Sequence, residues 1–553
     1  MQLVYFLIFF ISLNQSYLCF SLDIYIYPRV NPNVHNGSNF HPYGFDQEWQ
    51  LYIKGFLFKP FFSVHPDGNL YCSICQQGKT EEISTNTHKK LEFEFTIANN
   101  LFWGDGVPVT VGDVKFSLDV ADKVSIYKEV KSLNNFIIKI VENKKNDKNM
   151  RFILKKNIII NKILEGFVLI PKHIEEAVWI AAKKNPLSYL KKTNYRKKSN
   201  DPGLYYGHYS LSEIGKSKIS LVKNKYNDSS NNIDSIDLFF INQKTLIDHL
   251  ISGKKNFIFP EVSKGMEKII TKVRSNKYIS DKYKLVEGES CIYDHLILNH
   301  KNPVLLNSKV RKSLYHALDR DHIYEKIISH KVLPATSFIH PNSYSFYPKV
   351  VFYEYNPSKA EKLLVDAGWT IDENAAYRKK NGKTLQLSVL VNNIEQQSVR
   401  LAKYVAKLWE AVGIKTNIIA VGEDKYRMLM TSRKFTGVAL ASIDMSHVKD
   451  LSTLFSQKNI PSVINNYMGL NLSSWYNIKV EESVRKLRYE NNSTESYKLI
   501  SKLQLEYTND LPAIPLFFRM RRAITSMNIE GYQLNNRDQF SSSDVNQWRL
   551  SGL

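Results

Sequence analysis

The sequence predicts an α/β protein built from several domains, and two observations lead to this class. First, segments in which apolar and polar residues alternate, as in half-buried strands, follow one another with segments in which apolar residues recur every three to four positions, as in amphipathic helices. Second, the chain has 553 residues, which is more than one hydrophobic core organises, so we expect about three or four structural units. The chain shows no internal repeat and no low-complexity domain.

The best-defined helix start lies in LFWGDGVPVTVGDVKFSLDVADK, at 101–123. Thr110 and Asp113 stand at the spacing of a capping box, in which the acid three positions on reaches back to the capping residue. Gly104 and Gly106 suit a tight turn before it. The following residues share one apolar face: Val111, Val114, Leu118 and Ala121. The stretch therefore predicts a strand that passes through a turn into a helix, without a reactive group.

The same patterns predict the other elements along the chain. Strands are expected at 22–27, 91–97, within 131–164, at 209–212, 219–224, 236–241, 293–299 and 383–393, and after Gly413. Helices are expected around Trp49 and at 173–184, 243–252, 308–318, 319–327, 357–367, 397–412, 480–490 and 494–506. Residues 511–518 contain two prolines, so we expect a short strand that lies at a sheet edge or enters a cleft.

The net charge of +22 admits two explanations. One is a polyanionic partner or an anionic membrane surface. The other, which we favour, is a lysine-rich codon bias, because Asn, Ile, Lys and Tyr are abundant together and the basic residues are spread along the chain. The densest run, at 191–198, is interpreted as a solvated loop. No nucleic-acid partner is predicted, since the motifs of zinc fingers and RNA-binding sheets are absent from the sequence.

Motifs that carry catalysis or bind metals are also absent from the sequence. Cys72 and Cys75 form a lone C-x-x-C without a second pair or nearby histidines, so they are interpreted as a local disulfide or as two unrelated thiols rather than a metal site. The sequence contains no nucleophile elbow, no zinc-peptidase motif and no complete phosphate-binding loop. We therefore expect a binding protein rather than an enzyme, with no cofactor.

The N-terminus predicts export. Residues 2–13, QLVYFLIFFISL, are almost entirely apolar and are followed by a polar segment. This run fits a signal peptide at 1–21 better than a membrane span, which needs about 20 apolar residues. No Lys or Arg precedes the run, and Cys19 offers lipid modification as an alternative to simple cleavage. The expected product is an exported protein that is at most anchored at its N-terminus.

The stretch at 104–118 resembles the signature of the family 5 extracellular solute-binding proteins, the oligopeptide- and dipeptide-binding components of ABC importers. The matching residues are Trp103, Asp105, Gly106, Pro108, Thr110, Asp113, Val114, Phe116 and Ser117. Further segments resemble the family in its own order: 310–320, 334–337, 356–369, 413–415 and 511–516. Together these segments span nearly all of the chain after the predicted signal peptide.

The resemblance implies a bilobal periplasmic-binding-protein fold of the type II, Venus-flytrap kind, with an extra subdomain beside the first lobe. The predicted division is lobe I at 22–70, 200–295 and 510–553, the accessory subdomain at 71–199, and lobe II at 296–509, with hinge crossings near 295 and 509. A ligand is expected between the lobes, where it would shift the population toward a closed state.

The resemblance also implies where a ligand is held. In peptide-binding members, protein backbone pairs with the extended ligand as an added strand, and an Asp in a W-x-x-D segment holds the α-amine. Asp444, at the end of FTGVALASID, is the predicted equivalent, although the tryptophan is missing. Tyr27, near the end of the first strand, and Tyr293, at the predicted hinge, are cleft candidates by position, with core packing as the alternative. No catalytic or metal-binding residue is predicted.

The expected function is that of a monomeric periplasmic protein that captures peptides and delivers them to ABC transporter permease subunits in the inner membrane. Two alternatives remain open. The same fold could bind a metal chelate, haem, an opine or a sugar, which the missing tryptophan motivates. The chain could also be a surface or sensor protein that feeds no permease.

Overall fold

The computed structural model describes most of the chain, and structural statements below refer to these residues. The described ranges are 21–26, 38–44, 50–64, 70–84, 89–124, 137–143, 145–155, 167–227, 230–260, 267–328, 331–432, 434–448, 450–467, 469–488, 490, 493–534 and 542–551.

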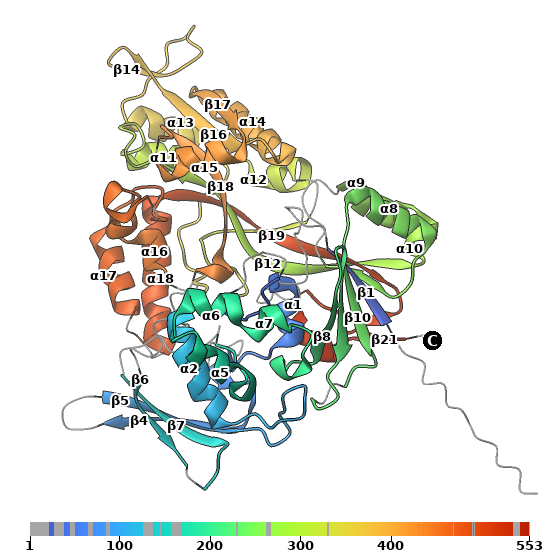
Figure 1. Cartoon of the computed structure of the whole chain (residues 1–553). Helices are drawn as coiled ribbons and strands as arrows, with labels where there is room; N and C mark the ends of the chain where they lie inside the picture. The colour runs from blue at the N-terminus through green and yellow to red at the C-terminus, as the bar shows by residue number, and fades with distance from the viewer. Residues whose placement is uncertain are drawn as a thin grey trace, which may run out of the picture.

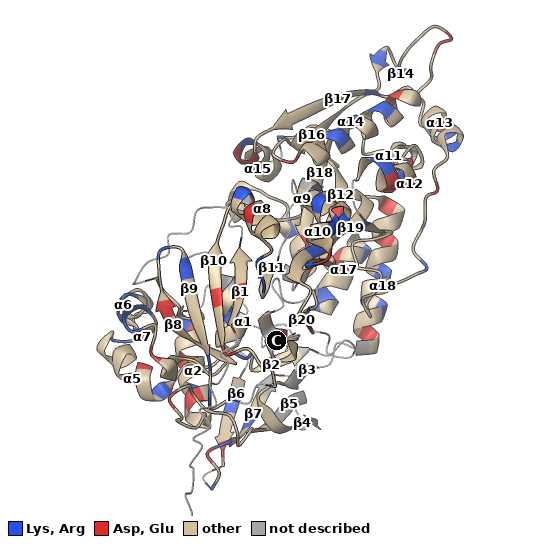
Figure 2. Ribbon diagram, turned by 90° about the vertical axis from the view of Figure 1, so that its right-hand side faces the viewer, with Lys and Arg blue, Asp and Glu red and all other residues tan. Residues whose placement is uncertain are grey.

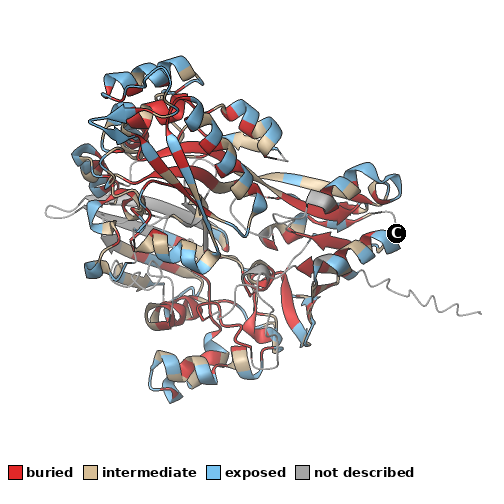
Figure 3. Ribbon diagram, turned by 90° about the horizontal axis from the view of Figure 1, so that it is seen from above, coloured by how far each residue is buried: buried red, intermediate tan, exposed pale blue. Residues whose placement is uncertain are grey.

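A large mixed sheet runs through the molecule (Figure 1). Within the described residues it has 11 strands, of which β13 (Val332–Pro334) pairs only with β19. The order of the others is β17 (Lys415–Val421), β16 (Gln386–Asn392), β18 (Val438–Asp444), β12 (Tyr283–Leu298), β19 (Ala513–Ser526), β11 (Phe257–Phe259), β1 (Ser21–Ile26), β10 (Ser235–Phe240), β9 (Lys218–Lys223) and β8 (Tyr209–Ile214). Figure 3 shows these strands largely buried between helices whose outer faces are exposed.

The two long strands β12 and β19 join the two halves of this sheet. They pair antiparallel from Tyr283 opposite Ser526 to Ile297 opposite Ala513, with two shifts of register on the way. β12 also pairs with β18, and β19 also pairs with β11. The predicted hinge crossings near 295 and 509 fall in β12 and in the last turn of α18 (Ser493–Asp510), and the division into lobes remains a prediction.

Of the two places predicted for 511–518, the sheet edge is wrong, and entry into a cleft stays a prediction. β19 has hydrogen-bonded neighbours on both sides and lies in the interior of the sheet. Pro515 is tolerated there because it lies beside a register shift. It pairs with His295, whereas the neighbouring Asp294 pairs with Phe517, so one residue of β19 between them has no direct partner in β12. The missing N–H of the proline therefore falls where a bulge already interrupts the ladder.

Helices surround the part of the sheet formed by β16 to β18. α14 contacts β16 and β17, and α11 packs on α13. Their bounds are α11 (Ser308–His316), α12 (Arg320–His322), η3 (Ile323–Ile327), α13 (Pro357–Asp366), α14 (Gln396–Ala411), α15 (Glu423–Thr431), η4 (Met445–His447), α16 (Ser452–Phe455), η5 (Gln457–Asn459), η6 (Val463–Asn465), α17 (Ile478–Leu487) and α18 (Ser493–Asp510). Leu296, Val389 and Trp409 belong to one buried core here, which joins the sheet to its covering helices.

A second group of elements lies on the other half of the sheet. It includes a four-stranded antiparallel sheet in the order β4 (Cys75–Ser84), β5 (Lys89–Ile97), β7 (Asn149–Lys155) and β6 (Ile137–Glu142). The helices are α1 (Gln50–Leu57), α2 (Val111–Val124), α5 (Lys172–Ala181), α6 (Pro186–Lys192), α7 (Asn194–Lys197), η2 (Pro202–Leu204), α8 (Gln243–Ser252), α9 (Glu267–Ser275), α10 (Lys277–Ser280) and η7 (Ser542–Gln547). Short strand pairs in this half are β2 (Phe62–Val64) with β3 (Leu70–Cys72) and β20 (Ile529–Glu530) with β21 (Arg549–Leu550), whereas the pair β14 (Lys379–Lys380) with β15 (Lys383–Thr384) lies on the half formed by β16 to β18 (Figure 1). One continuous core contains Phe95 and Trp103 together with Leu238 of the large sheet.

Of the capping box predicted at Thr110 and Asp113, the structure shows the half in which the acid reaches back to the capping residue. The Asp113 carboxylate accepts the Thr110 backbone N–H at 2.8 Å and the Thr110 hydroxyl at 3.2 Å. It also accepts the backbone N–H of Lys172 at 2.9 Å, which ties the start of α2 to the start of α5. Burial raises the pKa of this carboxyl, although its hydrogen bonds oppose the rise. Asp113 therefore joins the starts of α2 and α5, whereas the sequence predicted a role for it at the start of α2 alone.

The predicted solvated loop at 191–198 is corrected by the structure. Lys191 and Lys192 end α6, and Asn194–Lys197 form α7. Thr193 between these helices is buried and caps α7 by accepting the backbone N–H of Tyr195. The polar composition that suggested a loop instead reflects helix caps and exposed helix faces.

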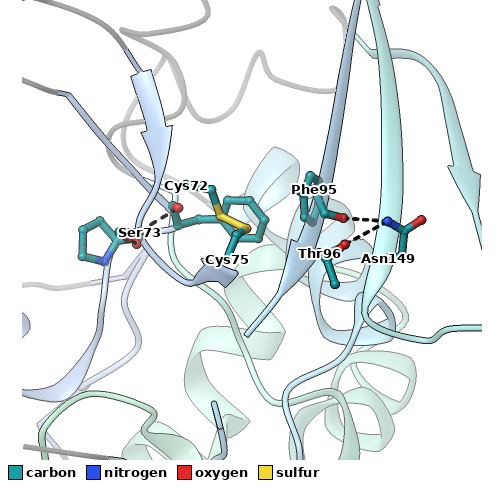
Figure 4. Close-up of a disulfide and its surroundings, with 8 residues drawn as sticks. Cys72, Ser73, Cys75, Phe95, Thr96 and Asn149 are labelled. Atoms are coloured by element: carbon teal, nitrogen blue, oxygen red, sulfur yellow. Dashed lines mark hydrogen bonds between the residues drawn. A yellow bond between two sulfur atoms is a disulfide. The ribbon is translucent and has the colours of Figure 1, made fainter. Parts of the chain in front are cut away.

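Cys72 and Cys75 form a disulfide across the turn between β3 and β4 (Figure 4). Replacing both with serine is expected to lower the free energy of unfolding by about 2 kcal/mol, because the bond closes a short loop in the unfolded chain. Thermal unfolding with and without a reducing agent measures the effect. Cys291→Ser is the control and should leave the reductant sensitivity intact. Equal stability of the oxidised and reduced protein would contradict this expectation.

Candidate functional site

Asp444 ends strand β18, next to β12 in the large sheet. It lies opposite Ile292 and caps the short helix η4. Its half-buried carboxylate accepts the backbone N–H of Ser446 at 2.9 Å and the Ser446 hydroxyl at 2.6 Å. β18 runs parallel to β16, and ligands of α/β sheets bind beyond the carboxyl ends of such strands. The position of Asp444 is therefore one from which a carboxylate can meet a ligand.

Tyr293 lies in a buried cluster between the sheet and α18. Its side chain is 2% exposed, and its hydroxyl lies 3.1 Å from that of Tyr507. Its ring stacks on the His295 ring at 4.6 Å between centroids. Burial raises the pKa of Tyr293 well above its ordinary value and lowers that of His295 to about 4. Ligand contact by Tyr293 stays a prediction, and Tyr27 lies outside the described residues.

A charged cluster that the sequence did not predict includes Ser442, which stands two residues before Asp444. Arg519 of β19 donates from Nε and Nη2 to the two carboxylate oxygens of Asp294 in β12, the Nη2 bond being 2.6 Å. Ser442 of β18 donates its hydroxyl to Asp294 at 2.5 Å and also accepts from Arg519. Three strands are therefore joined by side chains as well as by backbone hydrogen bonds.

The Asp294–Arg519 pair is nearly removed from solvent. The side chains of Arg519 and Asp294 are 17% and 6% exposed, and Glu395 at the start of α14 lies 4.0 Å from Arg519. Burial alone would lower the pKa of Arg519, but the Asp294 carboxylate outweighs it, so the pKa lies above its usual value. The pair therefore ties together the strands beside Asp444.

One sequence signal could have pointed to this cluster. Asp294 stands in the apolar run YDHLILN, and Arg519 follows the apolar residues LFF. A charged residue inside a buried strand needs a partner of opposite charge. The two residues are 225 positions apart, so nothing local identifies which charge pairs with which.

Replacing Tyr293 with phenylalanine is expected to lower the free energy of unfolding by about 1 kcal/mol, because the hydrogen bond with Tyr507 is lost. Tyr507→Phe removes the same bond from the other side and should cost the same. Denaturant unfolding and ligand titration of both variants decide the role of the hydroxyl. Loss of ligand affinity in Tyr293→Phe alone supports the predicted ligand contact, and unchanged affinity in both variants contradicts it.

Three further observations limit the chemistry that the site can perform. No group of His, Cys, Asp and Glu side chains within the described ranges is arranged to hold a metal ion. No helix among the described residues is long and apolar enough to cross a membrane. A small pocket lies far along the sheet from Asp444, between β1 and the C-terminal segment, and its lining is apolar: Ile24, Ile26, Phe56, Leu238, Ile258, Pro260, Tyr532 and Trp548.

Comparison with known proteins gives a consistent relationship. The family model described as bacterial extracellular solute-binding proteins, family 5 Middle, matches residues 79–459. The oligopeptide-binding protein AppA of Bacillus subtilis is 23% identical over 472 residues, which cover 83% of this chain and 81% of that protein.

Solved structures share the fold over nearly the whole chain. The structure of Bacillus subtilis AppA in complex with a nonapeptide has a TM-score of 0.64 at 19% identity, covering 97% of this chain and 100% of that one. The structure of NikZ from Campylobacter jejuni in complex with Ni(L-His) has a TM-score of 0.67 at 18% identity, covering 96% and 99%. The predicted α/β fold of the periplasmic-binding-protein type is thereby confirmed.

Proposed function

Because this chain belongs to the bacterial extracellular solute-binding proteins of family 5, we propose that it captures peptides between two lobes and delivers them to the permease of an ABC importer. The observation that carries the proposal is the similarity to an oligopeptide-binding protein over 83% of the chain. The likeness of the fold to a nonapeptide complex supports the same ligand class.

In this proposal Asp444 receives the α-ammonium group of the peptide. Its half-buried carboxylate accepts two hydrogen bonds from Ser446, which orient it. The rest of the peptide adds to the protein backbone as an extended strand, which makes side-chain selectivity loose. Tyr27 and Tyr293 are proposed as further contacts, and the ligand lies between lobe I (22–70, 200–295, 510–553) and lobe II (296–509).

The proposed location is the periplasm, with residues 1–21 as the export signal and Cys19 as a possible anchor. The Cys72–Cys75 disulfide supports a location outside the reducing cytoplasm. The proposed partners are permease subunits in the inner membrane, and the protein acts as a monomer without catalytic residues.

A non-peptide ligand is the second candidate. The fold is as close to a nickel–histidine complex as to the nonapeptide complex. The segment before Asp444 also lacks the tryptophan expected of peptide-binding members, since Ala441 stands three residues before it. A metal chelate or haem would then occupy the same space between the lobes.

Native mass spectrometry of the purified protein distinguishes the two candidates. We expect a series of bound masses that sequence as short peptides after release by acid. A single bound mass that contains no amino-acid sequence would overturn the peptide proposal and favour the second candidate. Unchanged peptide uptake after deletion of the gene would instead overturn delivery to a permease while leaving peptide binding intact.

A further inference from the structure

We propose that helices α5 to α7 carry a docking surface for an anionic membrane. The surface, called here the basic face, consists of exposed lysines around two exposed aliphatic side chains: Lys183, Lys184, Lys191, Lys192, Lys197 and Lys198 with Ile180 and Leu187. α5, α6 and α7 contact one another, and Figures 1 and 2 both show α6 and α7 side by side, with the basic positions of this region blue in Figure 2. The proposal does not depend on the ligand proposed above.

The two aliphatic side chains of the basic face are exposed to solvent, although other side chains of the same helices are buried. Ile180 is 60% exposed and Leu187 is 73% exposed. On α6, Leu187 and Lys191 are four residues apart and share the face opposite Tyr189, which is fully buried. A tight turn joins α5 to α6, in which the Lys183 N–H bonds the Ile180 carbonyl at 2.8 Å.

The positive charge of the basic face is not balanced by acidic residues nearby in the sequence. Between Glu176 and Asp201 the sequence contains no acidic residue. Lys184 pairs with Asp119 at 3.2 Å. The other five lysines of the face make no ion pair with any acid in the described part of the chain.

A buried network holds the basic face in shape from beneath. Glu175 is buried in α5 and accepts the Thr193 hydroxyl at 2.7 Å and the Asn194 backbone N–H at 2.8 Å, which ties the α6–α7 junction to α5. The rings of Trp179 and Tyr189 meet edge to face at 5.0 Å. The lysines therefore project from a preformed scaffold, and docking orders side chains only.

The chemistry of the basic face favours a lipid surface over nucleic acid or protein. Binding of single-stranded nucleic acid uses exposed aromatic rings for stacking, and the aromatic side chains here, Trp179, Tyr189 and Tyr195, are all buried. Exposed lysines together with exposed aliphatic groups on the same contacting helices match an interface where ammonium groups meet lipid phosphates and alkyl groups enter the headgroup boundary. An anionic bilayer is therefore the partner that uses both parts of the surface.

Vesicle sedimentation of the full-length protein tests the proposal. The partition coefficient is measured on vesicles of phosphatidylcholine with phosphatidylglycerol and on phosphatidylcholine alone, and the ratio of the two is compared between variants. The apolar residues 2–13 carry no charged side chain, so their contribution cancels in the ratio. We expect the variant K183Q/K184Q/K191Q/K192Q to lower the ratio by about 600-fold, since each of the four lysines near an anionic surface contributes about fivefold.

Two matched variants make the test specific. K403Q/K407Q/K415Q/K425Q removes the same charge from exposed lysines elsewhere and should keep most of the ratio. I180S/L187S should weaken binding to anionic vesicles even where high salt has screened the lysines. Its control V463S/I464S alters side chains that are 73% and 98% exposed and should have no effect.

Several results would overturn the proposal. One is equal binding of the wild-type protein to neutral and anionic vesicles. Another is an equal loss in the two lysine variants, which would assign the attraction to net charge alone. A third is retention on soluble polyphosphate or on acidic protein without binding to anionic vesicles.

Discussion

Replacing Asp294 with alanine is expected to lower the free energy of unfolding by about 3–5 kcal/mol, the usual effect of leaving one charge of a buried pair without its partner. Arg519 would keep its charge in a nearly buried position, and its remaining acidic neighbour, Glu395, lies 4.0 Å away. Ser442 would lose the acceptor of its hydroxyl as well. β12 would then lose its side-chain links to β18 and β19 in this cluster.

Denaturant unfolding of three variants separates this explanation from a general packing defect. Asp294→Leu combined with Arg519→Met removes both charges and should recover most of the loss, because apolar replacements of a buried pair are often nearly neutral. Glu495→Ala breaks the exposed pair with Lys498, whose side chains are 50% and 64% exposed, and should cost under about 1 kcal/mol. A cost that small for Asp294→Ala would show that the buried pair does not stabilise the fold.

Replacing Asp444 with asparagine is expected to weaken peptide binding by on the order of 100-fold, which corresponds to about 2.7 kcal/mol for a lost charge pair with the ligand ammonium group. Asparagine keeps an oxygen that accepts the Ser446 N–H, so the cap of η4 should survive. Isothermal titration with a peptide identified by mass spectrometry measures the change. The loss of affinity should therefore occur without a loss of stability.

Two controls tie that effect to the ammonium group. The N-acetylated peptide lacks the charge and should bind the wild-type protein about as weakly as the unmodified peptide binds Asp444→Asn. Asp372→Asn, at an exposed position of the same half of the molecule, should bind as tightly as wild type. Wild-type affinity in Asp444→Asn would show that the predicted ammonium contact is wrong.

Local features of the fold could be predicted from the sequence because short-range physics determines them. The helix start at Thr110 and Asp113 depends on residues three positions apart, and the hydrogen bond from the Thr110 N–H back to the Asp113 carboxylate is present. The helix predicted at 243–252 coincides with α8, whose start is capped by Asn242. In each case the side chain that caps the helix lies within the helix or directly before it in the sequence.

Features that depend on distant partners could not be predicted. The prolines near 515 suggested a sheet edge, but a bulge opposite His295 admits the strand to the interior. The polar run at 191–198 suggested a loop, but the buried Glu175 organises it into capped helices. Asp294 and Arg519 each look out of place in an apolar strand, and only the fold shows that they satisfy one another.

The position of β19 in the interior of the large sheet sets the order in which the chain can fold. β1, near the N-terminus, reaches β12 only through β11 and β19, and β19 consists of residues 513–526. A ribosome-bound chain that has not yet exposed these residues cannot join the two halves of the sheet, and contacts of such long sequence separation form slowly. The central ladder therefore closes only after residues 513–526 have been made, which makes its closure a late step of folding.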